Sequence, residues 1–336
     1  MKLPYMNCSK TILFSIILTF SVSGINGQQS PVFSQYVMNG FLINPSLAGR
    51  DGYTTVNLTA RDQWIGIKGS PTSFAASLQG AFLKKGKLFS KGKRRPSAPA
   101  KPTRVGLGGY LFNDNNGIIG RTGFQFSYAY HIPLAKNKLG QDDLSLGLSM
   151  VTYQHVLKTE DLQYSYNDDP YLSSYDRSVF ITDFNFGASY TSSRYYIDFA
   201  MTNILRGSLI YGNDSGYKRG IQGNFFFTGG GNIPLNRDWN LKPSAFLKFS
   251  DLVLSSMQLD LTTRIFYKDS YWAGLSYRTN NSIIVLLGLR YDKYYFGFAY
   301  DYTLTDIRQS TIGSMEFTIA AKFGESSRRY SWLNAF

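Results

Sequence analysis

The most constraining feature of this sequence is an alternation of apolar residues with small or polar residues at a period of two. In residues 123–132 (GFQFSYAYHI), for example, the large apolar side chains share one face and the other face carries Gly, Gln, Ser, Ala and His. Because successive side chains of a β-strand point to opposite sides, the pattern predicts strands rather than helices. About 14 such segments follow one another, separated by turn sequences such as residues 113–117 (NDNNG).

The residues on the two faces distinguish a membrane barrel from a soluble β-sandwich. A sandwich needs abundant Lys and Glu on its outer face, whereas the second face here is mostly Gly, Ser, Thr, Asn and Ala. A thin set of charges falls on that same face: Asp183, Asp198, Lys242, Lys248, Asp260, Arg264, Arg290, Asp301, Glu316 and Lys322. A lipid-facing Lys or Arg at the bilayer midplane costs about 2–4 kcal/mol, so these charges are expected in the lumen. We therefore predict an all-β fold, a transmembrane antiparallel β-barrel of about 14 strands of the outer-membrane type.

Composition and the N-terminus exclude several other classes. Charged residues make up 17% of the chain, below the roughly 25% of soluble domains, which argues against a disordered chain, a coiled coil or a charged helical bundle. The N-terminus has Lys2 and Lys10, an apolar stretch at residues 11–22, and then small residues. This order is typical of a secretory signal peptide, here cleaved after Gly27. An uncleaved anchor is the alternative, but a spanning helix needs about 20 apolar residues.

Arrangements that carry catalysis or bind metals are scarce. The single cysteine, Cys8, precedes the apolar stretch, and the two histidines, His131 and His155, fall on different predicted strands. No complete nucleophile motif, phosphate-binding loop or calcium loop occurs. We therefore expect a protein without enzymatic activity, cofactor or metal site.

The net charge of +13 is concentrated in one connection between predicted strands. Residues 83–103 hold eight basic side chains and no acidic one: Lys84, Lys85, Lys87, Lys91, Lys93, Arg94, Arg95 and Lys101. If both barrel termini are periplasmic, this stretch is periplasmic too, and the long connections at 155–179 and 204–223 lie outside. Either it docks on an acidic periplasmic partner or on anionic lipid headgroups, or it is a solvated loop. Nucleic acid is not an expected partner of an exported barrel.

Residues 28–50 precede the first predicted strand and are rich in large apolar side chains, namely Phe33, Tyr36, Met38, Phe41, Leu42 and Ile43. So many apolar groups are not expected to stay in water. They would plug the lumen, line the barrel mouth or dock on a partner. The predicted organisation is a signal peptide at 1–27, this N-terminal segment at 28–50, a barrel at 51–323 and a C-terminal tail at 324–336.

Motifs within residues 30–133 resemble those of a known family. They comprise Phe33, Ser34, Gln35 and Tyr36, then Asn44 and Pro45, then Arg61, Gln63, Trp64, Gly66 and Pro71, and finally Phe112, Asn113 and Asp114. Together they resemble the PorP/SprF family of the type IX secretion system of Bacteroidota. The resemblance implies an integral outer-membrane protein, often linked to gliding motility. It also implies that the protein acts together with periplasmic ring lipoproteins to secrete or anchor large adhesin-type proteins.

The motif residues are also candidates for partner contacts. Arg61, Gln63 and Trp64 are expected at the external end of the first strand. There Trp64 is either an ordinary interfacial tryptophan at the membrane surface, or the three residues bind a secreted protein. A porin for small solutes is the alternative function, since a polar lumen suits it equally.

Overall fold

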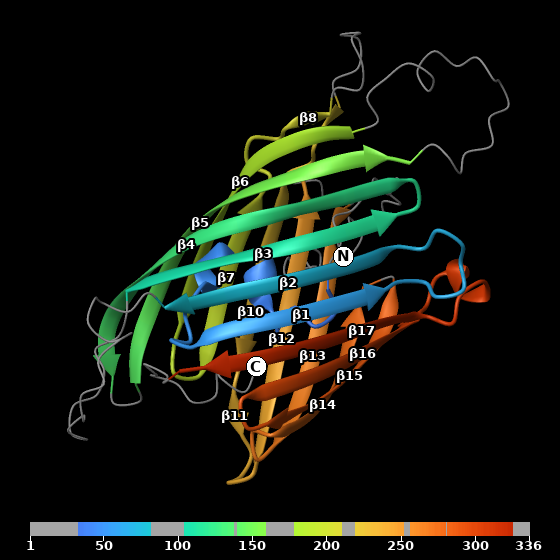
Figure 1. Cartoon of the computed structure of the whole chain (residues 1–336). Helices are drawn as coiled ribbons and strands as arrows, with labels where there is room; N and C mark the ends of the chain where they lie inside the picture. Colours follow the sequence, from blue (N-terminus) through green and yellow to red (C-terminus); the bar gives the residue numbers. More distant parts are fainter. Residues whose placement is uncertain are drawn as a thin grey trace, which may run out of the picture.

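The structure of this protein is a computed structural model. It describes residues 33–81, 104–137, 140–158, 178–209, 219–251, 256–279 and 281–324. The predicted signal peptide, the basic residues 84–101 and nearly all of the C-terminal tail lie outside the described residues. Within them the chain forms a closed antiparallel β-barrel of 14 strands, which confirms the predicted fold class (Figure 1). These residues contain no helix long and apolar enough to cross a bilayer.

The barrel strands follow one another around the wall in sequence order. They are β1 (Thr54–Asp62), β2 (Thr72–Ala81), β3 (Val105–Asn116), β4 (Ile119–Asn137), β5 (Gly140–Leu157), β6 (Ser178–Thr191), β7 (Tyr195–Thr202), β10 (Asn224–Gly231), β12 (Trp239–Ser250), β13 (Gln258–Tyr267), β14 (Tyr271–Arg278), β15 (Ser282–Tyr291), β16 (Tyr294–Thr303) and β17 (Ser314–Phe323). The pairing of β1 with β17 closes the barrel. Two-residue β11 (Ile233–Pro234) extends one edge of β12, and β8 (Ser208–Leu209) pairs with β9 (Arg219–Gly220) in a separate small sheet.

The two ends of the barrel carry different connections. We call the end where β1 begins and β17 ends the proximal end, and the opposite end the distal end. Thr54 pairs with Phe323, so both barrel termini lie at the proximal end. The long connections from β5 to β6 and from β7 to β10 leave the strands at the distal end, and the long connection from β2 to β3 leaves them at the proximal end.

The hairpin of β3 and β4 is longer than the sequence predicts. The polar residues 113–116 do not form a turn but continue β3, and β4 begins at Ile119. They pair across the hairpin, as Asn113 does with Thr122, to which its side-chain amide donates a hydrogen bond of 2.6 Å. Gly117, with φ at +57°, makes the turn instead. Cross-strand pairing satisfies polar side chains and backbone groups alike, so a polar composition alone does not end a strand.

Burial alternates along the strands as the barrel prediction requires. In β1 exposed and buried residues alternate without exception. Large apolar side chains such as Leu58, Phe126, Leu148 and Phe317 lie on the exposed outer face. The charges predicted to face the lumen are all buried except Arg290, which is half-buried. This sorting is what a lipid environment demands, because lipid tolerates apolar groups and excludes charge.

Candidate functional site

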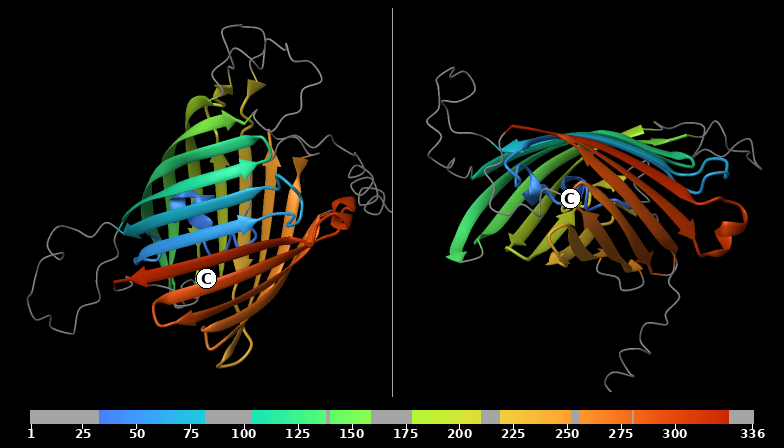
Figure 2. Two further views of the ribbon diagram at one scale, coloured as in Figure 1. Left: turned by 45° about the vertical axis from the view of Figure 1, so that its right-hand side comes forward. Right: turned by 90° about the horizontal axis from the view of Figure 1, so that it is seen from below.

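Residues 33–53, which we call the luminal segment, lie inside the barrel. They include the short 3-10 helices η1 (Gly40–Leu42) and η2 (Pro45–Leu47), seen in blue within the wall in Figure 1 and from below in Figure 2. The side chains of Tyr36, Met38 and Phe41 are buried there, with exposed fractions of 3%, 4% and 1%. The lumen therefore receives apolar surface that would otherwise face water.

The first residues of the luminal segment bind a cluster of buried charges on β1, β16 and β17. The backbone N–H groups of Ser34 and Gln35 donate to the Glu316 carboxylate at 2.6 and 2.9 Å. The Ser34 hydroxyl donates to Asp301 at 2.7 Å. Arg61 lies between the two acids, 2.7 Å from Asp301 and 3.1 Å from Glu316. The chain entering the lumen is thus held by charge-assisted hydrogen bonds, which are stronger than neutral ones.

This cluster continues around the wall as alternating acids and arginines. Arg278 on β14 binds Asp260 on β13, with the shortest nitrogen–oxygen distance at 2.8 Å, and also lies 3.6 Å from Asp301. Asp260, Arg278, Asp301, Arg61 and Glu316 therefore form one buried network, which we call the charge ladder. Buried ions of this kind are stable only while each retains its partners.

Both aromatic and polar side chains in the middle of the luminal segment contact the barrel wall. The Tyr36 ring packs against Phe246 on β12, with ring centroids 4.8 Å apart. Asn39 donates from its amide to the Ser77 hydroxyl on β2 at 3.1 Å. The Asn44 amide donates to the carbonyls of Ala188 and Phe199, on the neighbouring strands β6 and β7, at 3.3 and 3.2 Å. The segment therefore contacts both sides of the barrel interior.

Glycines on the inner face make room for this close approach. A Cβ at Gly106 on β3 would overlap the Ala48 carbonyl, and one at Gly147 on β5 would overlap the backbone of η2. A Cβ at Gly187 on β6 would overlap the Asn44 side chain. At these positions a larger residue would have to displace the luminal segment, since packed interiors hold no spare volume.

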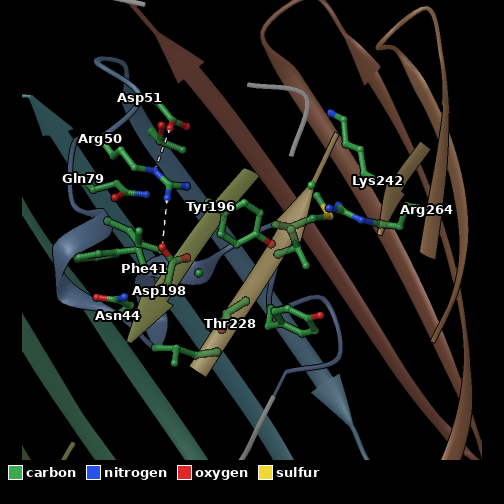
Figure 3. A pocket seen from close by; sticks show the side chains of 18 of the residues that line it. Phe41, Asn44, Arg50, Asp51, Gln79, Tyr196, Asp198, Thr228, Lys242 and Arg264 are labelled. Atoms are coloured by element: carbon green, nitrogen blue, oxygen red, sulfur yellow. Dashed lines mark ion pairs between the residues drawn. The ribbon is translucent and has the colours of Figure 1, made fainter. Parts of the chain in front are cut away.

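The luminal segment ends at the proximal mouth in a second group of charges. Asp51 lies 3.2 Å from the Lys322 ammonium on β17, and Arg50 lies 3.8 Å from Asp198 on β7. Beside them is a cavity of about 80 Å³ between the segment and strands β7, β10, β12 and β13. Figure 3 shows Lys242 and Arg264 on one side of this proximal cavity and Arg50 on the other.

A second cavity, of about 160 Å³, lies on the distal side of the luminal segment. Its lining includes Phe33, Tyr110, Phe112 and Tyr153 together with polar side chains such as Arg121. The rings of Tyr110, Phe112 and Tyr153 follow one another at centroid distances of 5.9 and 6.1 Å. The distal cavity is therefore lined in part by a row of three aromatic rings, whereas the interior of a barrel is usually polar.

Four other motif residues, Gln63, Trp64, Gly66 and Pro71, lie outside the lumen, in the connection between β1 and β2. The Gln63 N–H donates to the Pro71 carbonyl at 2.9 Å, and the Trp64 N–H donates to the Ser314 hydroxyl at 3.0 Å. Gly66 has φ at +103°, a conformation that favours glycine. This connection is hydrogen-bonded to the one between β16 and β17 through Ile65, whose N–H donates to the Gly313 carbonyl at 2.8 Å.

The structure thus separates the motif residues into three groups. Those of the luminal group are Phe33, Ser34, Gln35, Tyr36, Asn44, Pro45 and Arg61, those of the distal connection are Gln63, Trp64, Gly66 and Pro71, and Phe112, Asn113 and Asp114 lie on β3. Sequence reasoning did not link Arg61 to Asp301 and Glu316, although it placed both acids in the lumen. It did not single out the luminal glycines. The sequence signal that could have identified these glycines is that each falls on the inward face of its strand.

A family model described as "Type IX secretion system membrane protein PorP/SprF" matches residues 25–321. No curated protein sequence matches the chain.

Several solved structures are similar to this chain. One is BamA from Haemophilus ducreyi lacking POTRA domains 1–3, with 11% identity, 81% of this chain and 70% of that chain covered, and a TM-score of 0.41. Another is the toluene transporter TbuX of Ralstonia pickettii, with 10% identity, coverages of 91% and 100%, and a TM-score of 0.41. A third is the KdgM porin, with 9% identity, coverages of 81% and 99%, and a TM-score of 0.33. The fold assignment itself rests on the strand pairing described above.

Proposed function

Because the chain belongs to the PorP/SprF family of type IX secretion system membrane proteins, we propose that it is a non-enzymatic component of that machinery. In this proposal it takes part in the secretion or surface anchoring of large adhesin-type proteins through protein–protein contacts. The protein is located in the outer membrane.

The observation that carries the proposal is the luminal segment. It spans the interior from the charge ladder, reached by Ser34, to the proximal mouth, where Asp51 binds Lys322. Cavities of about 80 and 160 Å³ lie on its proximal and distal sides. A large protein does not pass through such an interior, so contacts at the two ends of the barrel carry the function.

The partners proposed for the two ends differ. With both barrel termini in the periplasm, as is usual for barrels with an even strand number, the proximal end meets the periplasmic ring lipoproteins. The distal end, with the hydrogen-bonded connections around Trp64 and Gly313, then meets the secreted adhesin. Outer-membrane lipid covers the apolar outer face.

A porin for small solutes remains the second candidate. The polar inner face favours it, because such a face would line a water-filled channel. A porin functions without protein partners, which separates the two candidates experimentally.

The test is a pull-down of the tagged chain from its own outer membrane in mild detergent, with mass spectrometry of what comes with it. The proposal expects periplasmic ring lipoproteins or a large secreted adhesin. A variant lacking residues 84–101 tests the basic stretch, and is expected to lose the periplasmic partners while retaining the adhesin. Recovery of the barrel alone from both preparations would contradict the proposal.

A further inference from the structure

The outer face of the barrel carries a groove of about 400 Å³ along the distal part of β1. Ala60 on β1 faces outward between Phe74 on β2 and Phe317 on β17, which are its two partners in the strand pairing. The three strands lie side by side in Figure 1. Because Ala60 is small and both of its neighbours carry rings, β1 forms the floor and the two phenylalanines form the walls. We call this feature the distal groove.

The lining of the distal groove is held in place by the loops above it. Ile65, from the connection between β1 and β2, lines the groove together with Met315 on β17. The Ile65 N–H donates to the Gly313 carbonyl at 2.8 Å. The Ile65 carbonyl accepts from the Ile312 N–H at 3.1 Å and from the Thr311 hydroxyl at 2.8 Å. A lining that is already ordered lowers the entropic cost of binding.

The polarity of the outer face changes along the groove. Phe74 and Phe317 are apolar and exposed by 47% and 55%. Asp62 and Thr72, which lie further toward the distal end and pair with each other, are polar and exposed and also line the groove. On a membrane barrel this change marks the passage from the hydrocarbon to the lipid headgroups. An occupant of the groove is therefore apolar at one end and polar at the other.

Asp62 supplies a negative charge at the polar end of the groove. Its side chain has no hydrogen bond or ion pair within the part of the chain that the structure describes. It follows Ala60 by two residues on the same face of β1, which is about 7 Å along a strand. Arg61 also lines the groove, but its guanidinium belongs to the charge ladder inside the lumen. Lys68, in the same connection, is exposed but does not line the groove. The carboxylate therefore favours a cationic group over an anionic one.

The material that lies against this face is lipid, because the chain is an outer-membrane barrel. Lipid tails are as apolar as the wall, so association within the bilayer depends on close packing rather than on the hydrophobic effect. A groove surrounds an acyl chain on several sides, whereas a flat wall contacts it on one, so the chain gains dispersion contacts there. The volume of about 400 Å³ has room for a run of methylene groups, since one water needs roughly 10–15 Å³.

We propose that the distal groove holds one acyl chain of a membrane lipid whose headgroup carries an amine. The acyl chain lies over Ala60 between the Phe74 and Phe317 rings, and the ammonium group contacts the Asp62 carboxylate. The lipid then packs against Ile65 and supports the connection between β1 and β2 from the membrane side. The inference rests on the lipid-facing position of the groove and not on the proposed protein partners, so the two can fail separately.

The first test is native mass spectrometry of the full mature chain in detergent micelles. The probes are phosphatidylethanolamine and phosphatidylglycerol with the same acyl chains. The first phosphatidylethanolamine is expected to bind about threefold more tightly than the first phosphatidylglycerol, as one exposed ion pair predicts. Asp62→Asn should remove this preference. Asp306→Asn should retain it, because Asp306 is an exposed acid at the same end that does not line the groove. Equal binding of the two lipids to the unmodified chain, or an unchanged preference in Asp62→Asn, would overturn the proposal.

The second test fills the groove. In Ala60→Phe a third ring occupies the space between the walls, so the first lipid is expected to bind about tenfold more weakly. Ala273→Phe is the matched control, since Ala273 is an exposed alanine on the outer face of β14 that does not line the groove. It should change the affinity by less than about twofold, because the lipid site is untouched. Unchanged binding in Ala60→Phe, or an equal loss in both variants, would contradict the proposal.

A measurement on the unmodified chain replaces the second test if Ala60→Phe does not fold, as judged by heat-dependent mobility on gels. The chain is placed in vesicles that contain phosphatidylethanolamine with a photoreactive diazirine on one acyl chain. Cross-links concentrated at Phe74, Met315 and Phe317 would support the proposal. Cross-links spread evenly around the outer face would overturn it. Cross-links that avoid the groove would also overturn it and leave the groove to a segment of another protein.

Discussion

Replacing Arg61 by methionine removes the cation that lies between two buried carboxylates. Asp301 and Glu316 have side chains exposed by only 3% and 0%, and Arg61 lies 2.7 and 3.1 Å from them. Removing one partner of a buried ion pair typically costs about 3–5 kcal/mol. Here Asp301 keeps Ser34 and Arg278, and Glu316 keeps two backbone N–H donors. We therefore expect a loss near the lower limit, about 3 kcal/mol.

The assay is reversible urea unfolding of the barrel in lipid vesicles, followed by tryptophan fluorescence. Arg206→Met is the matched control, because Arg206 also pairs with an acid, Asp251 at 3.5 Å, but is 53% exposed. It is expected to cost less than about 1 kcal/mol. Adding Glu316→Gln to Arg61→Met should recover part of the loss, since one uncompensated charge is then removed. Equal costs in the two arginine variants, or no recovery, would refute the view that Arg61 compensates the two buried carboxylates.

Three other predictions follow from the same geometry. Gly187→Leu, which places a side chain where Asn44 lies, should displace the luminal segment and make it sensitive to added protease, whereas the unmodified segment should be protected. Asn44→Ala should cost about 1–3 kcal/mol in urea unfolding, because two carbonyls and the start of η2 lose their side-chain partner; a change within experimental error would contradict the role assigned to this side chain. Leu287→Lys, in the middle of the outer face of β15, should lower the free energy of unfolding by about 2–4 kcal/mol. Leu235→Lys, in a proximal connection, should lower it by only about 0–1 kcal/mol. The reverse order would contradict the placement of the outer face in lipid.

The strand pattern was predictable because it depends on local sequence alone. A period of two assigns each side chain to one face, and lipid sorts the faces by polarity, so the buried positions of Asp260 and Lys322 followed from their neighbours in the chain. The length of the β3–β4 hairpin did not follow. Its polar end is stabilised by cross-strand bonds such as that of Asn113 with Thr122, which composition does not reveal.

The interior contacts required the closed barrel. Arg61 reaches Glu316 only because β1 pairs with β17, strands at opposite ends of the barrel sequence. The apolar residues of the luminal segment were expected to leave water, but no local pattern indicates that Asn44 meets Gly187. For the same reason the ion pair of Asp51 with Lys322 becomes visible only when β17 lies beside the luminal segment.

The central claim is that the lumen is occupied by the chain's own N-terminal segment and that the protein acts through its ends. The most direct measurement is the single-channel conductance of the purified mature chain in planar bilayers, compared with a variant lacking residues 28–50. We predict little conductance for the full chain and a large increase for the variant, because the charge ladder and the proximal cavity then line an open lumen. A full chain that conducts small ions freely, with no change on removal of the segment, would contradict the claim and favour a porin.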